Sequence, residues 1–254
     1  MILLDGKKTS NDIKDEIAIS VNEIKKRGEK VPHLAAVLVG NDGASLTYVG
    51  SKVRACERVG FNSTLIKLPE TSSEERLLKT ISDLNKNNEI DGFIVQLPLP
   101  KHISEEKVLL AINPNKDVDG FHPENFGKMA LEMDSFIPAT PFGILQLLER
   151  YQVETKGKHT VVIGRSHIVG RPMSILMSQK GPAANSTVTL THSYTKNLSE
   201  ITKQADIIVV ALGIPEYLKA DMVKDNVVII DVGISRVPDE SKPKGYVIKR
   251  DVAF

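Results

Sequence analysis

A tyrosine and a lysine four positions apart, Tyr48 and Lys52, are the first residues in this sequence whose types and spacing suit chemistry. On a helix, side chains four positions apart share a face, so the phenol and the amine would lie one turn from each other. The helix is predicted by Gly60, which can end it, and by the inward-facing positions Val49, Val53 and Cys56. A solvated lysine beside a half-buried tyrosine has the same spacing, so the pair alone leaves a catalytic and a structural interpretation open.

Gln96 and two aspartates, Asp117 and Asp119, provide further polar groups. Gln96 ends a predicted strand, and ligands of parallel α/β sheets bind at the carboxyl ends of the strands. Its amide could meet a ligand there, or it could cap the strand end by bonding to the proline loop that follows. The aspartates lie in the loop Lys116–Pro123, which is typical of a turn because aspartate bonds its own backbone.

A glycine-containing turn follows a predicted strand in the second half of the chain, from Val162 to Pro172. Gly164 would permit the tight turn, Gly170 would permit close approach of the backbone, and the amides of the helix after it would bind a pyrophosphate. The spacing differs from the usual G-x-G-x-x-G, so a glycine-bounded connection without a ligand is the alternative.

The end of the next predicted strand indicates which dinucleotide would bind. NAD-selective enzymes place a carboxylate there for the ribose 2′-hydroxyl, but residues 190–195 contain no acid. Arg165, His192 and Ser193 could instead accept a 2′-phosphate, which favours NADP over NAD. The competing interpretation is that His192 and Ser193 cap the following helix.

The composition excludes several classes of protein. A formal net charge of +1, without basic runs, gives no footprint for nucleic acid. No apolar run approaches the roughly 20 residues that cross a membrane, and residues 1–6 do not form a signal peptide, so we expect a cytoplasmic protein. The one cysteine, Cys56, excludes an internal disulfide and a zinc site of paired cysteines. The histidines have no metal-binding spacing, no metal is expected, and no serine-hydrolase elbow is present.

Apolar patterns predict alternating strands and helices in two domains. The first domain, residues 1–140, is predicted to have helices over 13–24, behind Thr9 and Ser10, and over 73–85. Its buried strands are predicted at 34–39, 63–66 and 91–96, and this alternation implies a parallel sheet covered on both faces.

The second domain, residues 141–254, is predicted to start with a helix that has Thr140 as N-cap and Pro141 as first helical residue. Its strands are predicted at 161–163, 187–190, 207–211 and 227–231, followed by a polar loop over 238–245.

Taken together, these motifs resemble the bifunctional methylenetetrahydrofolate dehydrogenase/cyclohydrolase family over nearly the whole length. The family's Y-x-x-x-K, D-G-x-x-V-Q-L-P-L-P and K-D-V-D-G-x-H-P correspond to Tyr48–Lys52, Asp91–Pro100 and Lys116–Pro123. Its G-R-S-x-I-V-G-x-P corresponds to Gly164–Pro172, and His192–Ser193 and Asp231–Ile234 are also in register.

The resemblance implies an α/β fold with a three-layer catalytic domain, a Rossmann-like NADP-binding domain and a cleft between them. It implies oxidation of 5,10-methylenetetrahydrofolate by NADP, hydrolysis of the methenyl product to 10-formyltetrahydrofolate, and a homodimer. The residues it assigns to catalysis are Lys52, as general acid and base oriented by a bond from Gln96, Tyr48, which would stack on the folate, and Asp119, which would bind the pterin. With Leu97 and Pro98 these also bind substrate, and the cofactor residues are Gly164, Arg165, Ser166, Ile168, Gly170, His192, Ser193, Gly213 and Ile234.

Two departures from the family pattern affect this interpretation. Residues 138–141 read P-A-T-P where the family commonly has P-C-T-P, and Arg250-Asp251-Val252 replaces the usual G-D-V. The family also continues beyond the position of Phe254 through a loop into a last helix. Two alternatives therefore stay open: another two-domain NADP oxidoreductase, such as one acting on a shikimate-type hydroxy acid, and a folate- or nucleotide-binding protein without catalysis.

Overall fold

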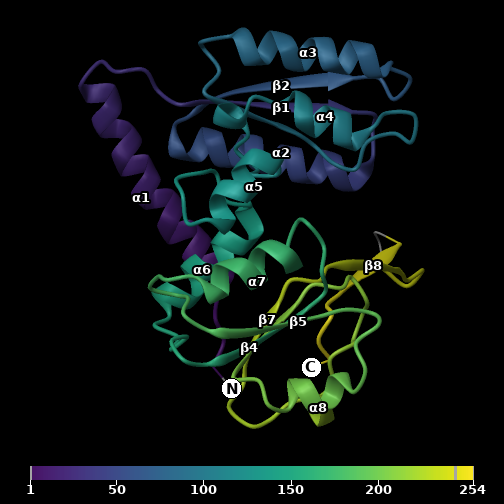
Figure 1. Ribbon diagram of the computed structural model, residues 1–254. Coiled ribbons are helices and arrows are strands. Elements are labelled where there is room, and N and C mark those ends of the chain that lie inside the picture. Colours follow the sequence, from purple (N-terminus) through teal and green to yellow (C-terminus); the bar gives the residue numbers. More distant parts are fainter. Residues whose placement is uncertain (1, 243–244, 254) are drawn as a thin grey trace. The chain divides into compact units, whose positions relative to one another are not determined.

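A computed structural model describes residues 2–242 and 245–253 of the chain. The chain separates into two compact units, residues 1–139 and 140–254, and each has its own parallel sheet (Figure 1). Within the described residues, no helix combines the length and the apolar character needed to cross a membrane.

The first unit is built around a three-stranded parallel sheet in the order β2-β1-β3. Its strands are β1 (His33–Val39), β2 (Asn62–Leu68) and β3 (Gly92–Val95). Its helices are α1 (Gly6–Lys26), α2 (Gly43–Val59), α3 (Glu74–Lys86), α4 (Glu105–Ala111), the short 3₁₀ helix η1 (Pro114–Lys116) and α5 (Pro123–Ala130). The predicted alternation of strands and helices is confirmed.

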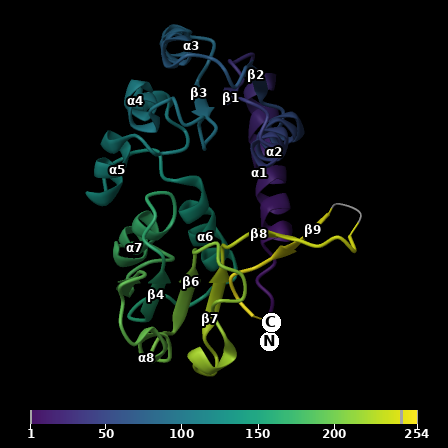
Figure 2. The same ribbon diagram turned by 90° about the vertical axis from the view of Figure 1, so that its right-hand side faces the viewer.

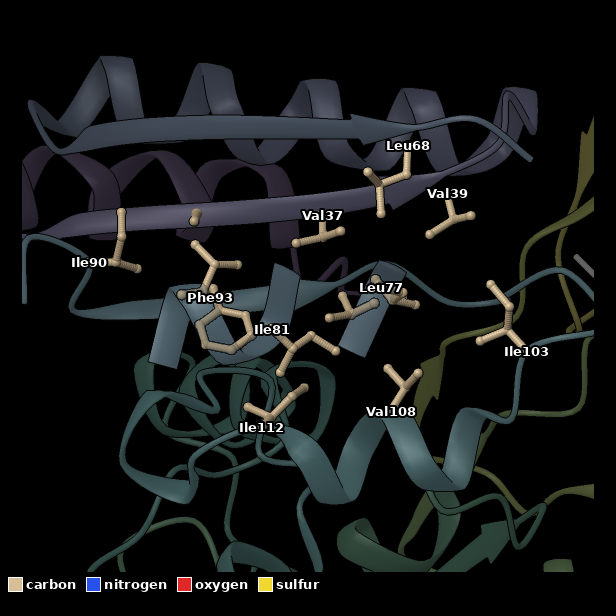
Figure 3. Packing of buried hydrophobic residues seen from close by; sticks show 13 residues of the cluster. Val37, Val39, Leu68, Leu77, Ile81, Ile90, Phe93, Ile103, Val108 and Ile112 are labelled. Atoms are coloured by element: carbon tan, nitrogen blue, oxygen red, sulfur yellow. The ribbon is translucent and has the colours of Figure 1, made fainter. Parts of the chain in front are cut away.

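Alternate residues of β1 face opposite layers, as the two-residue period of a strand requires. One face packs against α3 and α4, where Phe93 of β3 is also buried (Figure 3). The buried residues of this layer include Ala35, Val37, Val39, Leu77, Ile81, Leu84, Val108 and Ile112. The other face buries Ala36 and Leu38 against Val49 of α2. Apolar side chains on both faces explain why β1 and β3 are continuous hydrophobic runs in the sequence.

Helix α2 carries the tyrosine and the lysine, and its ends are fixed by local chemistry. The Asp42 carboxylate accepts a hydrogen bond from the Ser45 amide at 2.8 Å, which is a typical N-cap. Gly60 ends the helix in the left-handed conformation, with φ of 83°, as predicted. Val49 and Cys56 are buried, so the helix has one defined rotation about its axis.

The second unit contains a four-stranded parallel sheet in the order β5-β4-β6-β7. Its strands are β4 (His159–Ile163), β5 (Thr187–Thr191), β6 (Ile207–Val210) and β7 (Val228–Asp231), and its helices are α6 (Ala139–Arg150), α7 (Gly170–Ser178), α8 (Leu198–Thr202) and the 3₁₀ helix η2 (Ala220–Met222). An antiparallel pair, β8 (Ser235–Pro238) and β9 (Tyr246–Lys249), follows and projects from this sheet (Figure 2).

The amino edge of the first sheet is closed by a group that we call the histidine clamp, formed by His33, Asp91 and Thr64. The His33 amide donates to the Asp91 carboxylate at 2.8 Å, and its imidazole Nε2 lies 2.8 Å from the Thr64 hydroxyl. Lys30 pairs with Asp91 at 2.7 Å. The clamp thus joins all three strands at the edge where they begin.

The second sheet has the same histidine clamp, formed by His159, Asp206 and Thr189. The His159 amide donates to Asp206 at 2.8 Å, and the imidazole Nε2 lies 2.9 Å from the Thr189 hydroxyl. Lys224 pairs with Asp206 at 2.6 Å. In both sheets the threonine is paired two residues beyond the histidine, so the two clamps have the same register.

Three local predictions need correction. Helix α1 begins at Gly6 with Asp5 as N-cap, because the Asp5 carboxylate accepts from two helical amides, whereas Thr9 lies inside the helix. Helix α6 begins at Ala139, so Thr140 is not its N-cap; Pro141 fits the first turn because amides there need no intrahelical acceptor. The polar loop over 238–245 joins β8 and β9, which periodicity did not predict, and residues 243–244 lie outside the described part.

Candidate functional site

Lys52 and Asp119 form an ion pair in the first unit. The Lys52 Nζ lies 3.4 Å from Asp119 Oδ1, and the two side chains are 35% and 19% exposed. Tyr48, one turn earlier on α2, is 55% exposed. The structure therefore brings together an amine and a carboxylate from segments 67 residues apart, with a phenol on the same helix.

The loop that carries Asp119 is held against β3 by its second aspartate. Asp117 is buried, and its Oδ2 accepts hydrogen bonds from the His122 amide at 2.8 Å and from Asn125 Nδ2 at 2.9 Å. Asp117 also forms a parallel bridge with Phe93 of β3. Because the bridge is parallel, the chain runs on from Asp117 toward the carboxyl end of β3, which is where Asp119 meets Lys52.

A glycine completes the fixation of this loop. Gly120 has φ of 68°, and a Cβ there would lie 2.7 Å from the Phe136 carbonyl oxygen and 2.8 Å from backbone atoms of Ile137 and Pro138. A side chain has no room at this position. The two aspartates therefore differ in role: Asp117 bonds the loop to itself, as turn chemistry predicts, and Asp119 is presented to Lys52.

Burial raises the pKa of the Asp119 carboxyl above its ordinary value. Loss of hydration is the larger effect, the Lys52 ammonium opposes it, and the nearby Asp117 carboxylate adds to it. A poorly hydrated carboxylate is a strong acceptor for hydrogen-bond donors of a ligand, because it exchanges few water contacts for them.

Gln96 follows β3 directly, and its backbone amide bonds to the Val37 carbonyl at 2.9 Å. Its side-chain Nε2 donates to the Leu97 carbonyl at 2.7 Å, so the expected bond to the Lys52 amine is replaced by a cap on the strand end. The Leu97–Pro98 peptide is cis. Gln96 Oε1 is buried without a hydrogen-bond partner among the described residues. The glutamine thus caps the strand with one atom and retains an unused acceptor on the other.

In the second unit, two glycines allow the turn after β4 to pass close to its surroundings. Gly164 has φ of 112°, and a Cβ there would lie 2.5 Å from the Ala211 carbonyl oxygen. A Cβ on Gly170, the first residue of α7, would lie 2.6 Å from the Gly164 carbonyl carbon and 2.9 Å from Arg165 Cα. Any larger residue at either position would therefore displace the turn.

The amides available to a ligand in this turn differ from those predicted. The Ser166 hydroxyl accepts from the Val169 amide at 3.1 Å and the Gly170 amide at 3.4 Å, and its carbonyl accepts from the Arg171 amide at 3.0 Å. The first amides of α7 are therefore already used. Within the described chain, no hydrogen bond uses the amides of the exposed residues 165–168. Four free N–H groups in the loop, beside the Arg165 guanidinium, form a donor set suited to dinucleotide phosphates.

The segment after β5 closes on itself. The His192 amide donates to the Thr195 hydroxyl at 2.9 Å, and the Thr195 amide returns to the His192 carbonyl at 2.8 Å. Helix α8 begins at Leu198 with Asn197 as N-cap, so His192 and Ser193 do not cap it. Ser193 is exposed and His192 partly exposed at the carboxyl edge of the sheet, where both remain accessible to a ligand.

A buried aspartate that sequence reasoning did not select fixes two further loops. Asp251 is fully buried, and its Oδ2 accepts from the amides of Leu212 and Gly213 at 2.7 and 2.9 Å. Its carboxyl group fills the place that a Cβ on Gly233 would take. Asp231 in turn accepts from the amides of Gly233 and Asp251 at 3.1 and 3.3 Å. The loops after β6 and β7 are thereby joined to the segment that contains Asp251.

Comparison with known protein families shows which family this chain belongs to. Residues 4–119 match the tetrahydrofolate dehydrogenase/cyclohydrolase catalytic domain, and residues 138–254 match the NAD(P)-binding domain of the same family. The chain belongs to this family. The match covers both units, and it removes the alternative of a shikimate-type oxidoreductase.

Individual relatives of the family are similar over the whole chain. The Bifunctional protein FolD of Flavobacterium psychrophilum is 74% identical over 254 residues, which are 100% of this chain and 86% of the relative. The FolD methylenetetrahydrofolate dehydrogenase/cyclohydrolase of Campylobacter jejuni has a TM-score of 0.92 at 43% identity, covering 100% of this chain and 86% of that one. The Trypanosoma brucei enzyme, solved with NADP and an inhibitor, has a TM-score of 0.93 at 32% identity with the same coverages.

The residues that the family pattern selects fall into two groups, one in each unit. Lys52 and Asp119 are in direct contact, Gln96 lies at the end of β3, and Tyr48 is exposed on α2. In the second unit, the Gly213 amide is used by Asp251, and Ile234 is 51% exposed. No group of three histidine, cysteine or acidic side chains in the described part could hold a metal ion.

Sequence reasoning missed Asp251 and Tyr194. Asp251 was noted only as part of a departure from the family pattern, and its amide partners lie 38 and 39 residues away. No local pattern could indicate pairings at that distance. Tyr194 stands between His192 and Thr195 in a segment considered for its lack of acids, and its aromatic ring gave no signal of its own.

Proposed function

We propose that this protein oxidises 5,10-methylenetetrahydrofolate with NADP⁺ and hydrolyses the resulting 5,10-methenyltetrahydrofolate to 10-formyltetrahydrofolate. The observation that carries the proposal is the Lys52–Asp119 pair, in which an amine lies beside a desolvated carboxylate in the domain that matches the family's catalytic domain. Family membership over both units supports both activities.

In the oxidation, NADP⁺ supplies the hydride acceptor when it is bound. The residues that would hold it are the free amides of 165–168, which suit its diphosphate, and Arg165, His192 and Ser193, which suit its 2′-phosphate. The protein needs no acid or base for loss of a hydride, so its contribution to this step is orientation. Asp119 would accept hydrogen bonds from the N–H groups of the pterin, and the exposed ring of Tyr48 would stack on the aminobenzoate.

The hydrolysis needs proton movement, because water attacks the methenyl carbon and a C–N bond then breaks. Lys52 in its amine form would take the proton of the attacking water and return it to the departing nitrogen. The step then balances: the carbon gains oxygen, the departing nitrogen gains one proton of the water, the second water proton is released to solvent as the hydroxyl becomes the formyl carbonyl and the positive charge is lost, and the lysine is unchanged. The free Gln96 Oε1 is an acceptor at the same strand end and would hold the water or the lysine ammonium.

An absorbance assay with methylenetetrahydrofolate and NADP⁺ tests both steps at once. The expected record is a rise in methenyl absorbance followed by its decay, at a rate above that of spontaneous hydrolysis. Absence of NADP-dependent methenyl formation would contradict the proposal and would support the alternative of a folate- or nucleotide-binding protein. Equal turnover with NAD⁺ and NADP⁺ would contradict the role given to Arg165.

We also propose that the protein acts as a cytoplasmic homodimer, as the family resemblance implies. Light scattering during size-exclusion chromatography would give about twice the chain mass of 27.9 kDa for a dimer. A mass equal to that of one chain at micromolar concentration would contradict it.

A further inference from the structure

Tyr194 is a strongly exposed aromatic residue with defined ring contacts. Its side chain is 81% exposed. The Arg165 guanidinium carbon lies 5.9 Å from the centre of its ring, and the His192 ring meets it edge-on, with the centroids 6.2 Å apart. Its backbone amide donates to His192 Nδ1 at 3.2 Å. One ring thus contacts the Arg165 guanidinium and the His192 imidazole, which follow β4 and β5.

In the described part of the chain, no carboxylate pairs with Arg165 to orient it. Within the described residues, no ion pair involves Arg165, and its guanidinium lies over the ring of Tyr194. A guanidinium within about 6 Å of an aromatic centroid is attracted by the ring face. An aromatic ring, unlike an aspartate, restricts the arginine without neutralising it, so the full positive charge remains available to an anion.

His192 is oriented by the same residue. Its Nδ1 accepts the Tyr194 amide, so a neutral imidazole must carry its proton on Nε2, and Nε2–H is then the atom that can donate to a ligand. The positions of both side chains therefore depend on residue 194, Arg165 through the ring and His192 through the backbone. The backbone bond to His192 does not depend on the side chain at position 194, whereas the ring contacts with Arg165 and His192 require an aromatic one.

We propose that Tyr194 is a positioning residue that holds the Arg165 guanidinium for the 2′-phosphate of NADP and so contributes to selection of NADP over NAD. The proposal rests on the proposed function, which makes NADP the cofactor. The location fits, because the adenosine ribose of a dinucleotide lies beyond the end of the second strand of such a unit, here β5. Tyr194 acts through Arg165 and is not itself a catalytic residue.

Titration calorimetry with NADPH and with NADH tests the proposal without relying on turnover. The variants are Y194L, which keeps an apolar side chain without a ring, and Y194F, which restores the ring. We expect Y194L to raise the Kd for NADPH about two- to fivefold, which is the size of an exposed cation–π contact at 1.4 kcal/mol per tenfold, and to leave the Kd for NADH unchanged. Y194F should recover the NADPH affinity that Y194L loses.

A double-mutant cycle shows whether the effect passes through Arg165. In an R165Q background, the Y194L change should have no further effect on the Kd for NADPH. Additive losses would overturn the proposal, as would an unchanged Kd in Y194L. Equal weakening of NADPH and NADH would also overturn it, because the ring would then be stacking on the adenine, which both cofactors share.

Two controls separate this inference from the proposed function. Tyr246, whose ring lies 4.8 Å from the Arg236 guanidinium on the β8–β9 hairpin, provides a matched pair, and Y246L should leave the NADPH affinity unchanged. If the unsubstituted protein binds no NADPH, the cofactor assignment fails and this inference fails with it. If the unsubstituted protein binds NADPH tightly and Y194L has the same Kd for NADPH, only the role of Tyr194 is rejected.

Discussion

Substitution of Gly170 by alanine should abolish tight cofactor binding while leaving most of the second unit folded. The added Cβ would lie 2.6 Å from the Gly164 carbonyl carbon and closer still to its oxygen, whereas Cβ contacts below 3.0 Å essentially do not occur. The neighbouring atoms are all backbone, so no side chain can rotate away. The turn would have to move by more than 0.4 Å, the shortfall at the carbonyl carbon alone.

The displaced segment includes the amides of 165–168 and the Arg165 side chain. A displacement of about 1 Å at such a group can reduce the rate of catalysis about 100-fold, and overpacking of this kind costs about 1–3 kcal/mol of stability. We therefore expect G170A to raise the KM for NADP⁺ at least tenfold, with a Tm lowered by several degrees. Dehydrogenase kinetics and thermal unfolding measure these two quantities, and calorimetry measures the accompanying loss of NADPH affinity.

The matched control is G143A, in helix α6 of the same unit. A Cβ at Gly143 would meet nothing within 4 Å, so alanine should stabilise the helix by about 0.5–1 kcal/mol and leave NADPH affinity unchanged. Wild-type affinity for NADPH in G170A would refute the argument that close backbone packing at this position shapes the cofactor loop.

Three other predictions concern charged residues. K52M should lower cyclohydrolase activity at least about 100-fold, as loss of a general acid–base does. The control is K79M, at a lysine whose side chain is 76% exposed, which should keep this activity. Near-normal hydrolysis by K52M would exclude the proposed role of Lys52. Because the folded-state pKa of Asp119 is raised, its carboxylate costs stability above that pKa, and this cost disappears as pH falls through it. D119N should therefore be more stable relative to wild type at pH 7 than at pH 4. A stability difference between the two proteins that does not change with pH would contradict this. D251A should leave the Leu212 and Gly213 amides without their acceptor and lower the unfolding free energy by about 1–3 kcal/mol in total, so denaturant midpoints equal to wild type would contradict the structural role.

Strands β1, β3, β4 and β6 could be predicted from the sequence because each contains a short apolar run that is almost entirely buried. Helix α2 could be predicted because Gly60 and the inward-facing residues are local signals. The β8–β9 hairpin could not, since each of its strands has only 4 residues and none of them is buried. The predicted start of α1 was wrong because Asp5, which lies before Thr9 in the chain, is the N-cap of this helix.

For the candidate site, the sequence indicated candidate residues but not the hydrogen-bond partners of their side chains. Lys52 was expected to be oriented by Gln96, yet the glutamine bonds to the next residue in the chain and Asp119 takes its place. A side chain that can satisfy itself locally loses less conformational entropy than one that reaches across the fold. The role of Ser166 shows the same preference, since its hydroxyl closes its own turn.

The two histidine clamps have a consequence for how such a protein can change. Each sheet is fastened at its amino edge by a histidine, an aspartate and a threonine, while the groups that meet ligands lie in loops at the opposite edge. Loops at the carboxyl edges can therefore be replaced, lengthened or adapted to a different cofactor without loosening the strands they leave. Conversely, variants of the clamps provide a way to tune the lifetime of the folded protein while the ligand preferences of either domain stay as they are.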